Sequence, residues 1–136
     1  CRFRFASDKS KLGFVQIGMH IITGWGSGTR LMEKIGTNQG LTLLLTGEMF
    51  DSQKGKEIGF ITEVYPQDEL KESVFKLAEK IAKQPLPGIL AYMKIAKMVD
   101  SNLSREVCIE EEIDLCSDLW GSEDHYAVIQ KFLNKK

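Results

Sequence analysis

The sequence predicts an α/β fold, with a small α/β layer over residues 1–66 followed by a helical subdomain over residues 67–136. Two observations lead to this division. Short alternating or β-branched segments separated by glycine-containing turns fill the first part, as is typical of strands joined by tight connections. From Pro66 onward, apolar residues recur with the period of amphipathic helices.

The first part opens with two short extended segments. Residues 2–6 alternate basic and apolar side chains, as a half-buried strand does, and residues 12–15 predict a second strand. A glycine-rich turn occupies residues 23–28. A helix is expected to follow over residues 29–35, with Gly36 as its C-cap.

Polar residues mark the start of the next helices. Thr37 is expected to cap a leucine-rich helix, and Asp51 with Ser52 can cap a short helix that ends around Gly59. Residues 60–65 are rich in β-branched and aromatic side chains, which predicts a strand.

The second part predicts four helices. Leu70, Val74, Leu77, Ala78 and Ile81 form one apolar stripe, and two prolines at positions 85 and 87 then interrupt the chain. The remaining helices are expected over residues 88–99, 104–120 and 122–133, with the run of three glutamates at positions 110–112 on a solvated face.

Composition excludes several classes of function. The net charge of -1 gives no electrostatic reason to expect nucleic acid or an anionic membrane, and no apolar run approaches the length of a membrane helix. The three cysteines, Cys1, Cys108 and Cys116, form no disulfide framework and are interpreted as thiols packed like small hydrophobes. His20 and His125 are isolated, so no metal site is expected.

The first residue is Cys1 rather than methionine, and it leads directly into a predicted strand. Natural domains usually begin in a disposable tail, so we expect that material upstream of this chain is absent. A targeting segment would be lost with that material.

The turn at residues 23–28 raises the question of phosphate binding, because free N–H groups at a helix N-terminus bind anions. The dinucleotide fingerprint requires glycine at the sixth position counted from Gly24, and that position is Thr29. The pattern therefore favours a tight turn whose glycines permit positive φ and close packing.

An ordered string of motifs is more specific than any single one. Residues 4–7 (RFAS), 11–14 (KLGF) and 23–31 (TGWGSGTRL) are followed at suitable spacing by 43–47 (LLLTG), 57–61 (EIGFI), 64–66 (VYP) and 131–133 (KFL). Together they resemble the enoyl-CoA hydratase/isomerase (crotonase) superfamily. The resemblance covers essentially the whole chain but only the second half of a typical member.

The resemblance implies the C-terminal part of a ββα spiral, followed by a helical subdomain that helps to form trimers. It implies thioester enolate chemistry on an acyl-CoA substrate, with coenzyme A as part of the substrate and no tightly bound cofactor. The two backbone N–H donors that hold the enolate would lie in the N-terminal half, supplied in cis or in trans. A homo-oligomer, trimer or hexamer, is expected, in the cytoplasm or in a eukaryotic mitochondrion.

Gln16 is the candidate catalytic residue. Hydratases of this superfamily use two glutamates to add water, and the second of them falls at this position. Glutamine forms hydrogen bonds but does not exchange a proton near neutral pH. The resemblance therefore argues against efficient hydration, whereas a simpler interpretation is a polar residue that satisfies a backbone group near a turn.

Trp25, with the flanking Gly24 and Gly26, is the candidate substrate pocket. Hydratases typically have a small residue at position 25 and a proline at position 23. The tryptophan, together with residues 14–16, looks more like the decarboxylases of the superfamily that act on ethylmalonyl- or methylmalonyl-type thioesters. Trp25 either shapes an apolar pocket or belongs to the core, and both interpretations stay open.

Trp120, Phe132 and Lys135 are candidates for coenzyme A binding, because C-terminal residues of the superfamily lie against the nucleotide, sometimes from a neighbouring subunit. Each has an ordinary alternative. Trp120 and Phe132 could be core residues, and Lys135 could lie in a solvated tail.

Three functions remain in competition. The first is a non-hydratase acyl-CoA enzyme, such as a decarboxylase, whose activity needs the missing half. The second is a hydratase or isomerase with an altered acid/base residue. The third is a catalytically inert module that self-associates through its C-terminal helices.

Overall fold

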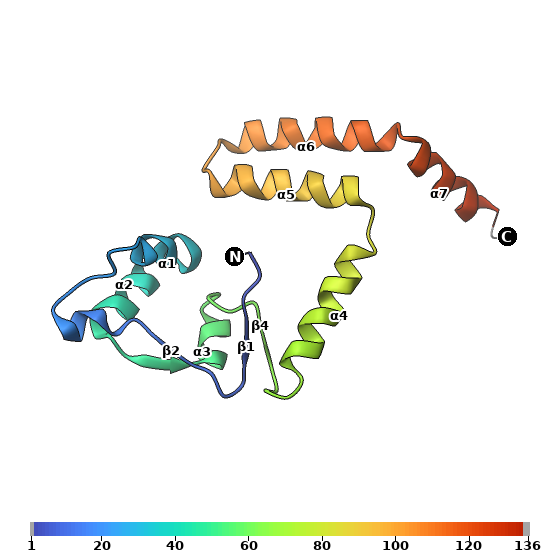
Figure 1. The fold of residues 1–136 in the computed structure, drawn as a ribbon. Helices are drawn as coiled ribbons and strands as arrows, with labels where there is room; N and C mark the ends of the chain where they lie inside the picture. Colours follow the sequence, from blue (N-terminus) through green and yellow to red (C-terminus); the bar gives the residue numbers. More distant parts are fainter. Residues whose placement is uncertain (1, 135–136) are drawn as a thin grey trace. The chain divides into compact units, whose positions relative to one another are not determined.

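Strand β1 (Phe5–Ser7) pairs in parallel with β4 (Glu63–Tyr65), which brings together two segments far apart in the sequence. The computed structural model describes residues 2–134, and its two compact units are Cys1–Leu77 and Ala78–Lys136. Just before β1 in the first unit, the Arg4 carbonyl accepts a hydrogen bond from the Thr62 N–H, and the Arg4 N–H donates to the Thr62 side-chain Oγ1. The resulting architecture is α/β, with small sheets and surrounding helices (Figure 1).

A second two-stranded sheet joins β2 (Lys11–Gly13) and β3 (Met49–Asp51) in antiparallel register. The sequence did not predict β3, because three residues are too few to establish an alternating pattern. Its central residue, Phe50, is buried with Leu31 and Leu43, and these three side chains form the core of the first unit.

The prediction that the second strand extends to residue 15 was wrong. The strand ends at Gly13, and residues Val15–Met19 form a 3-10 helix, η1. Its pairing partner β3 begins only at Met49, just after a left-handed turn at Gly47, so residues 14 and 15 have no strand beside them. His20 closes η1 in the left-handed conformation (φ 57°), and the following backbone bonds to the Gln16 carbonyl.

Helices α1 (Ser27–Ile35) and α2 (Thr37–Thr46) lie side by side, joined by Gly36 (Figure 1). Gly36 has a positive φ of 85°, which confirms the predicted C-cap. Thr37 is the first residue of α2 and not its cap, and its side chain makes no capping hydrogen bond.

Helix α3 (Ser52–Glu57) begins as predicted, because the Asp51 carboxylate accepts a hydrogen bond from the Lys54 N–H at 2.7 Å. The strand predicted over residues 60–65 is shorter and starts at Glu63. The Arg4 guanidinium donates to the Gly59 and Phe60 carbonyls and lies over the Phe60 ring, so this backbone is satisfied by a side chain rather than by a strand.

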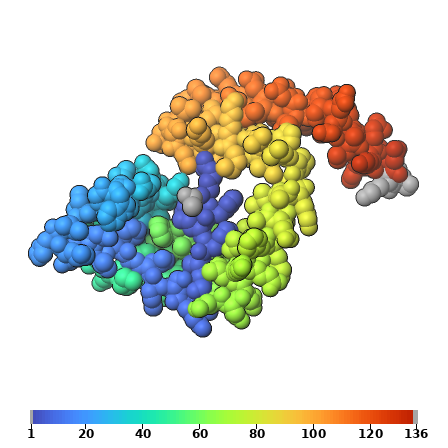
Figure 2. All heavy atoms as spheres, viewed as in Figure 1, coloured from blue at the N-terminus to red at the C-terminus, as the bar shows by residue number. Residues whose placement is uncertain are grey.

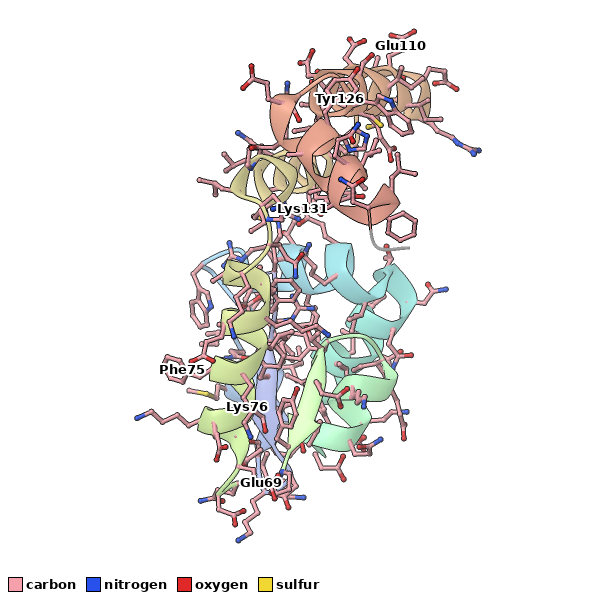
Figure 3. The ribbon with its side chains drawn as sticks, turned by 90° about the vertical axis from the view of Figure 1, so that its right-hand side faces the viewer. Glu69, Phe75, Lys76, Glu110, Tyr126 and Lys131 are labelled. Atoms are coloured by element: carbon pink, nitrogen blue, oxygen red, sulfur yellow. The ribbon has the colours of Figure 1, made fainter. Side chains whose placement is uncertain are left out.

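Two surface ion pairs perturb carboxyl groups in the first unit. Lys56 on α3 donates to Glu63 on β4, and the Val64 N–H donates to the same carboxylate, so the pKa of Glu63 lies below its ordinary value. On α4 (Leu70–Ala82), the hydrogen bond from Lys76 to Glu72 lowers the pKa of Glu72 and raises that of Lys76. Phe75 on the same helix projects outward and is exposed (Figure 3).

The second unit contains the end of α4 and helices α5 (Leu86–Asp100), α6 (Arg105–Trp120) and α7 (Glu123–Leu133). The atoms of α5 and α6 meet along the lengths of both helices (Figure 2), and the ion pair between Lys94 and Glu111 joins them. The side chains of Ser104 and Ser122 cap α6 and α7.

Burial in this unit is low, since none of the described residues of α5, α6 or α7 is buried. The interpretation of the cysteines as thiols packed like small hydrophobes was wrong for Cys116, which is exposed, while Cys108 is half-buried; Cys1 lies outside the described residues. Glu110 projects from the outer side of α6 (Figure 3), in agreement with a solvated face. The division of the sequence at residue 66 stays a prediction.

Candidate functional site

The first unit contains a cavity of about 300 Å³ between η1, α1, α2 and the segment that links η1 to α1. Its lining is almost entirely aliphatic or aromatic, with a glutamine and two threonines as the polar members: Phe14, Gln16, Ile17, Ile21, Ile22, Thr23, Gly28, Thr29, Met32, Leu41, Leu44 and Leu45. Apolar walls with a few polar groups are characteristic of small-molecule pockets.

Helical spacing explains how each of the two helices contributes one of its faces to the lining. Helix α1 contributes positions 28, 29 and 32, and α2 contributes positions 41, 44 and 45, so each set lies on one helix face. The helices approach closely where glycines leave room. A Cβ atom at Gly40 would lie only 3.1 Å from the Met32 Cα, and one at Gly28 would lie 2.9 Å from the Thr23 Oγ1.

Gln16 is the most distinctive residue of the cavity. Its backbone carbonyl accepts a hydrogen bond from the Ile21 N–H at 3.3 Å, which fixes the residue within the end of η1. Its side-chain Oε1 is buried, yet no described residue donates a hydrogen bond to it. An unsatisfied buried acceptor costs about 1–3 kcal/mol, so this position of Gln16 lowers the stability of the fold.

The glycine-rich turn before α1 is held by Thr23. Its Oγ1 accepts a hydrogen bond from the Gly28 N–H at 3.0 Å, which satisfies an N–H group in the first turn of the helix. Gly26 has a positive φ of 73° and Gly28 is buried against Thr23, so the turn uses one glycine for backbone freedom and another for close packing.

Only one of the predicted site residues of the first unit lines this cavity. Gln16 lines the cavity, whereas Trp25, Gly24 and Gly26 are not among its lining residues. Trp25 is 62% exposed, so it is not a core residue of this chain, and its carbonyl accepts a hydrogen bond from Arg30 at 2.9 Å. The assignment of Trp25 to a substrate pocket stays a prediction.

The second unit has its own cavity, of about 220 Å³, between α5, α6 and the start of α7. Trp120 lines it and lies 5.0 Å from the ring of His125, measured between ring centroids. Phe132 is 79% exposed on α7 and does not line this cavity. Lys135 lies outside the described residues. Neither aromatic residue is core in this chain, so both remain available as predicted contacts for coenzyme A.

A third cavity, of about 210 Å³ in the first unit, differs in its chemistry. Arg4, Arg30 and Lys34 line it together with Phe14 and Phe60. Phe14 lines both this basic cavity and the apolar cavity around Gln16. Cationic side chains are therefore gathered in a different cavity from the glutamine.

Within residues 2–134, no group of three or more His, Cys, Asp or Glu side chains is placed to hold a metal ion. The helices described over the same residues also lack the combination of length and apolarity needed to cross a membrane.

Comparison with known proteins places this chain in a family. The sequence profile of the enoyl-CoA hydratase/isomerase family matches residues 1–136. The chain belongs to this family. Human ethylmalonyl-CoA decarboxylase is a family relative that is 31% identical over 133 residues, which is 96% of this chain and 43% of that protein.

Two further relatives carry hydratase names. A protein of Rhizobium meliloti (strain 1021) named "Probable enoyl-CoA hydratase" is 29% identical over 137 residues, covering 100% of this chain and 52% of its own length. The crystal structure of enoyl-CoA hydratase from Bacillus anthracis superposes with a TM-score of 0.81 at 28% identity, over 100% of this chain and 52% of that one. The chain thus spans about half the length of the relatives it matches.

Sequence reasoning missed most of the cavity wall. The spacing of Leu41, Leu44 and Leu45 was visible, but it predicts only a helix face and not what that face meets. Met32 carried no signal of its own, because its place in the wall depends on the close approach of α1 to Gly40.

Proposed function

We propose that this chain is part of an acyl-CoA-processing enzyme of the non-hydratase kind, which decarboxylates a short 2-carboxyacyl thioester. The observation that carries the proposal is the neutral amide of Gln16 in a cavity whose described lining includes no Asp, Glu or His. By the resemblance described above, a hydratase would have a carboxylate at this position. General acid–base help is worth about 10²–10⁴ in rate, and an amide does not supply it.

Decarboxylation has no need of that proton exchange at Gln16. The bond between Cα and the carboxylate carbon breaks, its electron pair passes to the thioester as an enolate, and CO₂ leaves. A proton then adds at Cα to give the shortened acyl thioester. An apolar wall disfavours the charged carboxylate more than it disfavours neutral CO₂. The cavity lining therefore favours the loss of CO₂ from the substrate. The role of Gln16 is to orient the departing group by hydrogen bonding.

Hydration is the second candidate, because one observation favours it. Gln16 lines the cavity, and an amide side chain can hydrogen-bond a water molecule. In that case Gln16 positions the water and another group exchanges the proton. The names of the relatives include both hydratase and decarboxylase. Hydration and decarboxylation must therefore be distinguished by measuring their products.

The proposal includes coenzyme A and a partner. Trp120 and Phe132 are exposed aromatic residues suited to stack on an adenine ring, and Lys135 is a candidate for its phosphates. The exposed apolar residues of α5, α6 and α7 support a homo-oligomer, trimer or hexamer. The chain is assigned to the C-terminal half of the enzyme, with the other half supplied in cis or in trans.

The test uses the full-length protein that contains this chain and compares products from crotonyl-CoA and from ethylmalonyl-CoA. We expect CO₂ release from ethylmalonyl-CoA to exceed hydration of crotonyl-CoA. Gln16→Glu should raise hydration by roughly tenfold or more, because it restores a carboxylate. The same change should slow decarboxylation, since two like charges about 4 Å apart repel by about 4 kcal/mol at an effective dielectric near 20.

Gln53→Glu is the matched control, because Gln53 is exposed on α3 and does not line the cavity. This substitution adds the same charge as Gln16→Glu, but outside the cavity. It should leave both rates unchanged. A ratio of the two activities that is the same in wild type and Gln16→Glu would contradict a role for Gln16 in the reaction. Hydration that exceeds decarboxylation in the wild type would favour the second candidate.

A further inference from the structure

The cavity around Gln16 is uncharged over all of its described lining residues, which include no lysine, arginine or histidine. Cationic side chains do occur nearby in the same unit. Arg4, Arg30 and Lys34 line the separate basic cavity, and Phe14 is the residue shared by the two cavities. The local arrangement therefore keeps positive charge out of the cavity that holds the buried glutamine.

The hydrogen-bonding groups of the cavity also make it a poor site for a carboxylate. Its three polar side chains are Gln16, Thr23 and Thr29. Thr23 accepts a hydrogen bond from the Gly28 N–H at 3.0 Å, so the donors of this lining are the neutral amide of Gln16 and the hydroxyl groups of the two threonines. A carboxylate that leaves water needs a cation or several donors in exchange, and this lining offers it no cation and only a few neutral donors.

Size adds a second restriction. About 300 Å³ is at the lower end of the range for small-molecule pockets, so the cavity suits a short chain of a few carbons. Facing rows from α1 and α2 supply aliphatic contact along it, through Met32 on one side and Leu41, Leu44 and Leu45 on the other. Each methylene that leaves water for such a wall raises affinity by about fourfold.

We infer that this cavity selects short acyl groups with an uncharged aliphatic end and discriminates against acyl groups whose far end is a carboxylate. The inference rests on the proposed function, since it takes the cavity as the acyl site of a coenzyme A thioester. It concerns the far end of the acyl group and not the carboxylate next to the thioester, which the proposed reaction removes.

The experiment measures binding of two unreactive esters of equal carbon number, pentanoyl-CoA and glutaryl-CoA, to the full-length protein by calorimetry. The two ligands differ only in that a terminal carboxylate replaces a methyl group. We expect pentanoyl-CoA to bind at least about tenfold more tightly, because the carboxylate loses its hydration without gaining a partner. Equal affinities, or tighter binding of glutaryl-CoA, would overturn the inference.

A variant tests whether the wall itself sets this preference. Leu45 lines the cavity and is 60% exposed, so Leu45→Lys places an ammonium at the rim with little loss of burial. It should raise glutaryl-CoA affinity by about threefold to fivefold, the effect of one partly screened ion pair. Leu45→Gln introduces a polar side chain without the charge and should raise glutaryl-CoA affinity by less than Leu45→Lys does.

Thr42→Lys is the matched control for net charge, since Thr42 is exposed on the same helix and does not line the cavity. It should leave the ratio of the two affinities as in the wild type. If Thr42→Lys shifts the ratio as much as Leu45→Lys does, the preference does not come from the wall and the inference falls. If neither ester binds at all, the proposed function falls and the inference with it, whereas equal binding removes the inference alone.

Discussion

Gln16 lowers the stability of the fold, which is not expected of a residue with a purely structural role. Its Oε1 is buried without a described donor, although its backbone is well bonded within η1. Residues at functional sites often break a rule of polar satisfaction in this way, and the surrounding structure must compensate. Here the compensation comes from backbone hydrogen bonds at the end of η1, where the His20 N–H donates to the Ile17 carbonyl and the Ile21 N–H donates to the Gln16 carbonyl.

A substitution at this residue should therefore stabilise the protein. Gln16→Met keeps a side chain of similar length and removes the unsatisfied acceptor, so we expect unfolding to require about 1 kcal/mol more free energy. Activity should fall at the same time, as the proposed orienting group is lost. Urea unfolding at equilibrium measures the first effect, and Gln53→Met at the exposed α3 position serves as control with no expected gain. A loss of stability in Gln16→Met would mean that the amide is satisfied in solution.

At the scale of elements, the crossing of α1 and α2 depends on Gly40. A Cβ atom there would lie 2.9 Å from the Met32 Cγ and 3.1 Å from its Cα, so an added methyl group meets backbone as well as a flexible side chain. Because Met32 also lines the cavity, this contact couples the packing of the helices to the shape of the candidate site.

Two glycine substitutions separate packing from helix propensity. Gly40→Ala should destabilise the protein by about 1–3 kcal/mol, since overpacking exceeds the gain of replacing glycine inside a helix. Gly88→Ala on α5 should stabilise it by about 0.5–1 kcal/mol, because nothing lies within 4 Å of the added atom. Thermal or urea unfolding of both variants provides the measurement. A stabilising Gly40→Ala would show that α1 and α2 can separate at little cost.

Most helices and the Asp51 cap could be predicted from sequence because the deciding interactions are local, whereas the prediction of Thr37 as a cap was wrong. Asp51, Ser104 and Ser122 each bond an N–H group three residues ahead, a relation that spacing alone reveals. Strand β3 and η1 could not be predicted in the same way. Their form depends on which backbone lies opposite, and the pairing of Gly13 with Met49 joins positions far apart in the chain.

The candidate site shows the same limit. Gln16 could be selected from the sequence through a resemblance, yet its unsatisfied oxygen is visible only in three dimensions. Trp25 attracted attention by its type, but its side chain is 62% exposed and lies outside the cavity lining. The wall residues come from two helix faces whose meeting depends on the fit of Met32 against Gly40.

At the scale of the whole molecule, the distribution of apolar surface is the dominant feature. Core residues that are fully buried lie in the first unit, whereas no described residue of α5, α6 or α7 is buried. Large apolar side chains are exposed along each of these helices, among them Leu90, Ile113 and Val128, which are 59%, 61% and 63% exposed. Exposed apolar side chains that gather into a patch mark sites of association, so these helices are candidates for one.

We therefore expect the protein to be oligomeric at micromolar concentration, as measured by light scattering, with a trimer or hexamer as the first expectation. Ile113→Glu introduces a charge at an exposed apolar position of α6, and a charge buried in an interface without a partner is strongly unfavourable. It should raise the dissociation constant by about tenfold or more while leaving the helical circular dichroism unchanged, because Ile113 contributes little burial within its own chain. Gln84→Glu, at an exposed position after α4, adds the same charge and should leave the assembly unchanged. A wild-type protein that is monomeric at these concentrations would contradict the assignment of this surface to self-association.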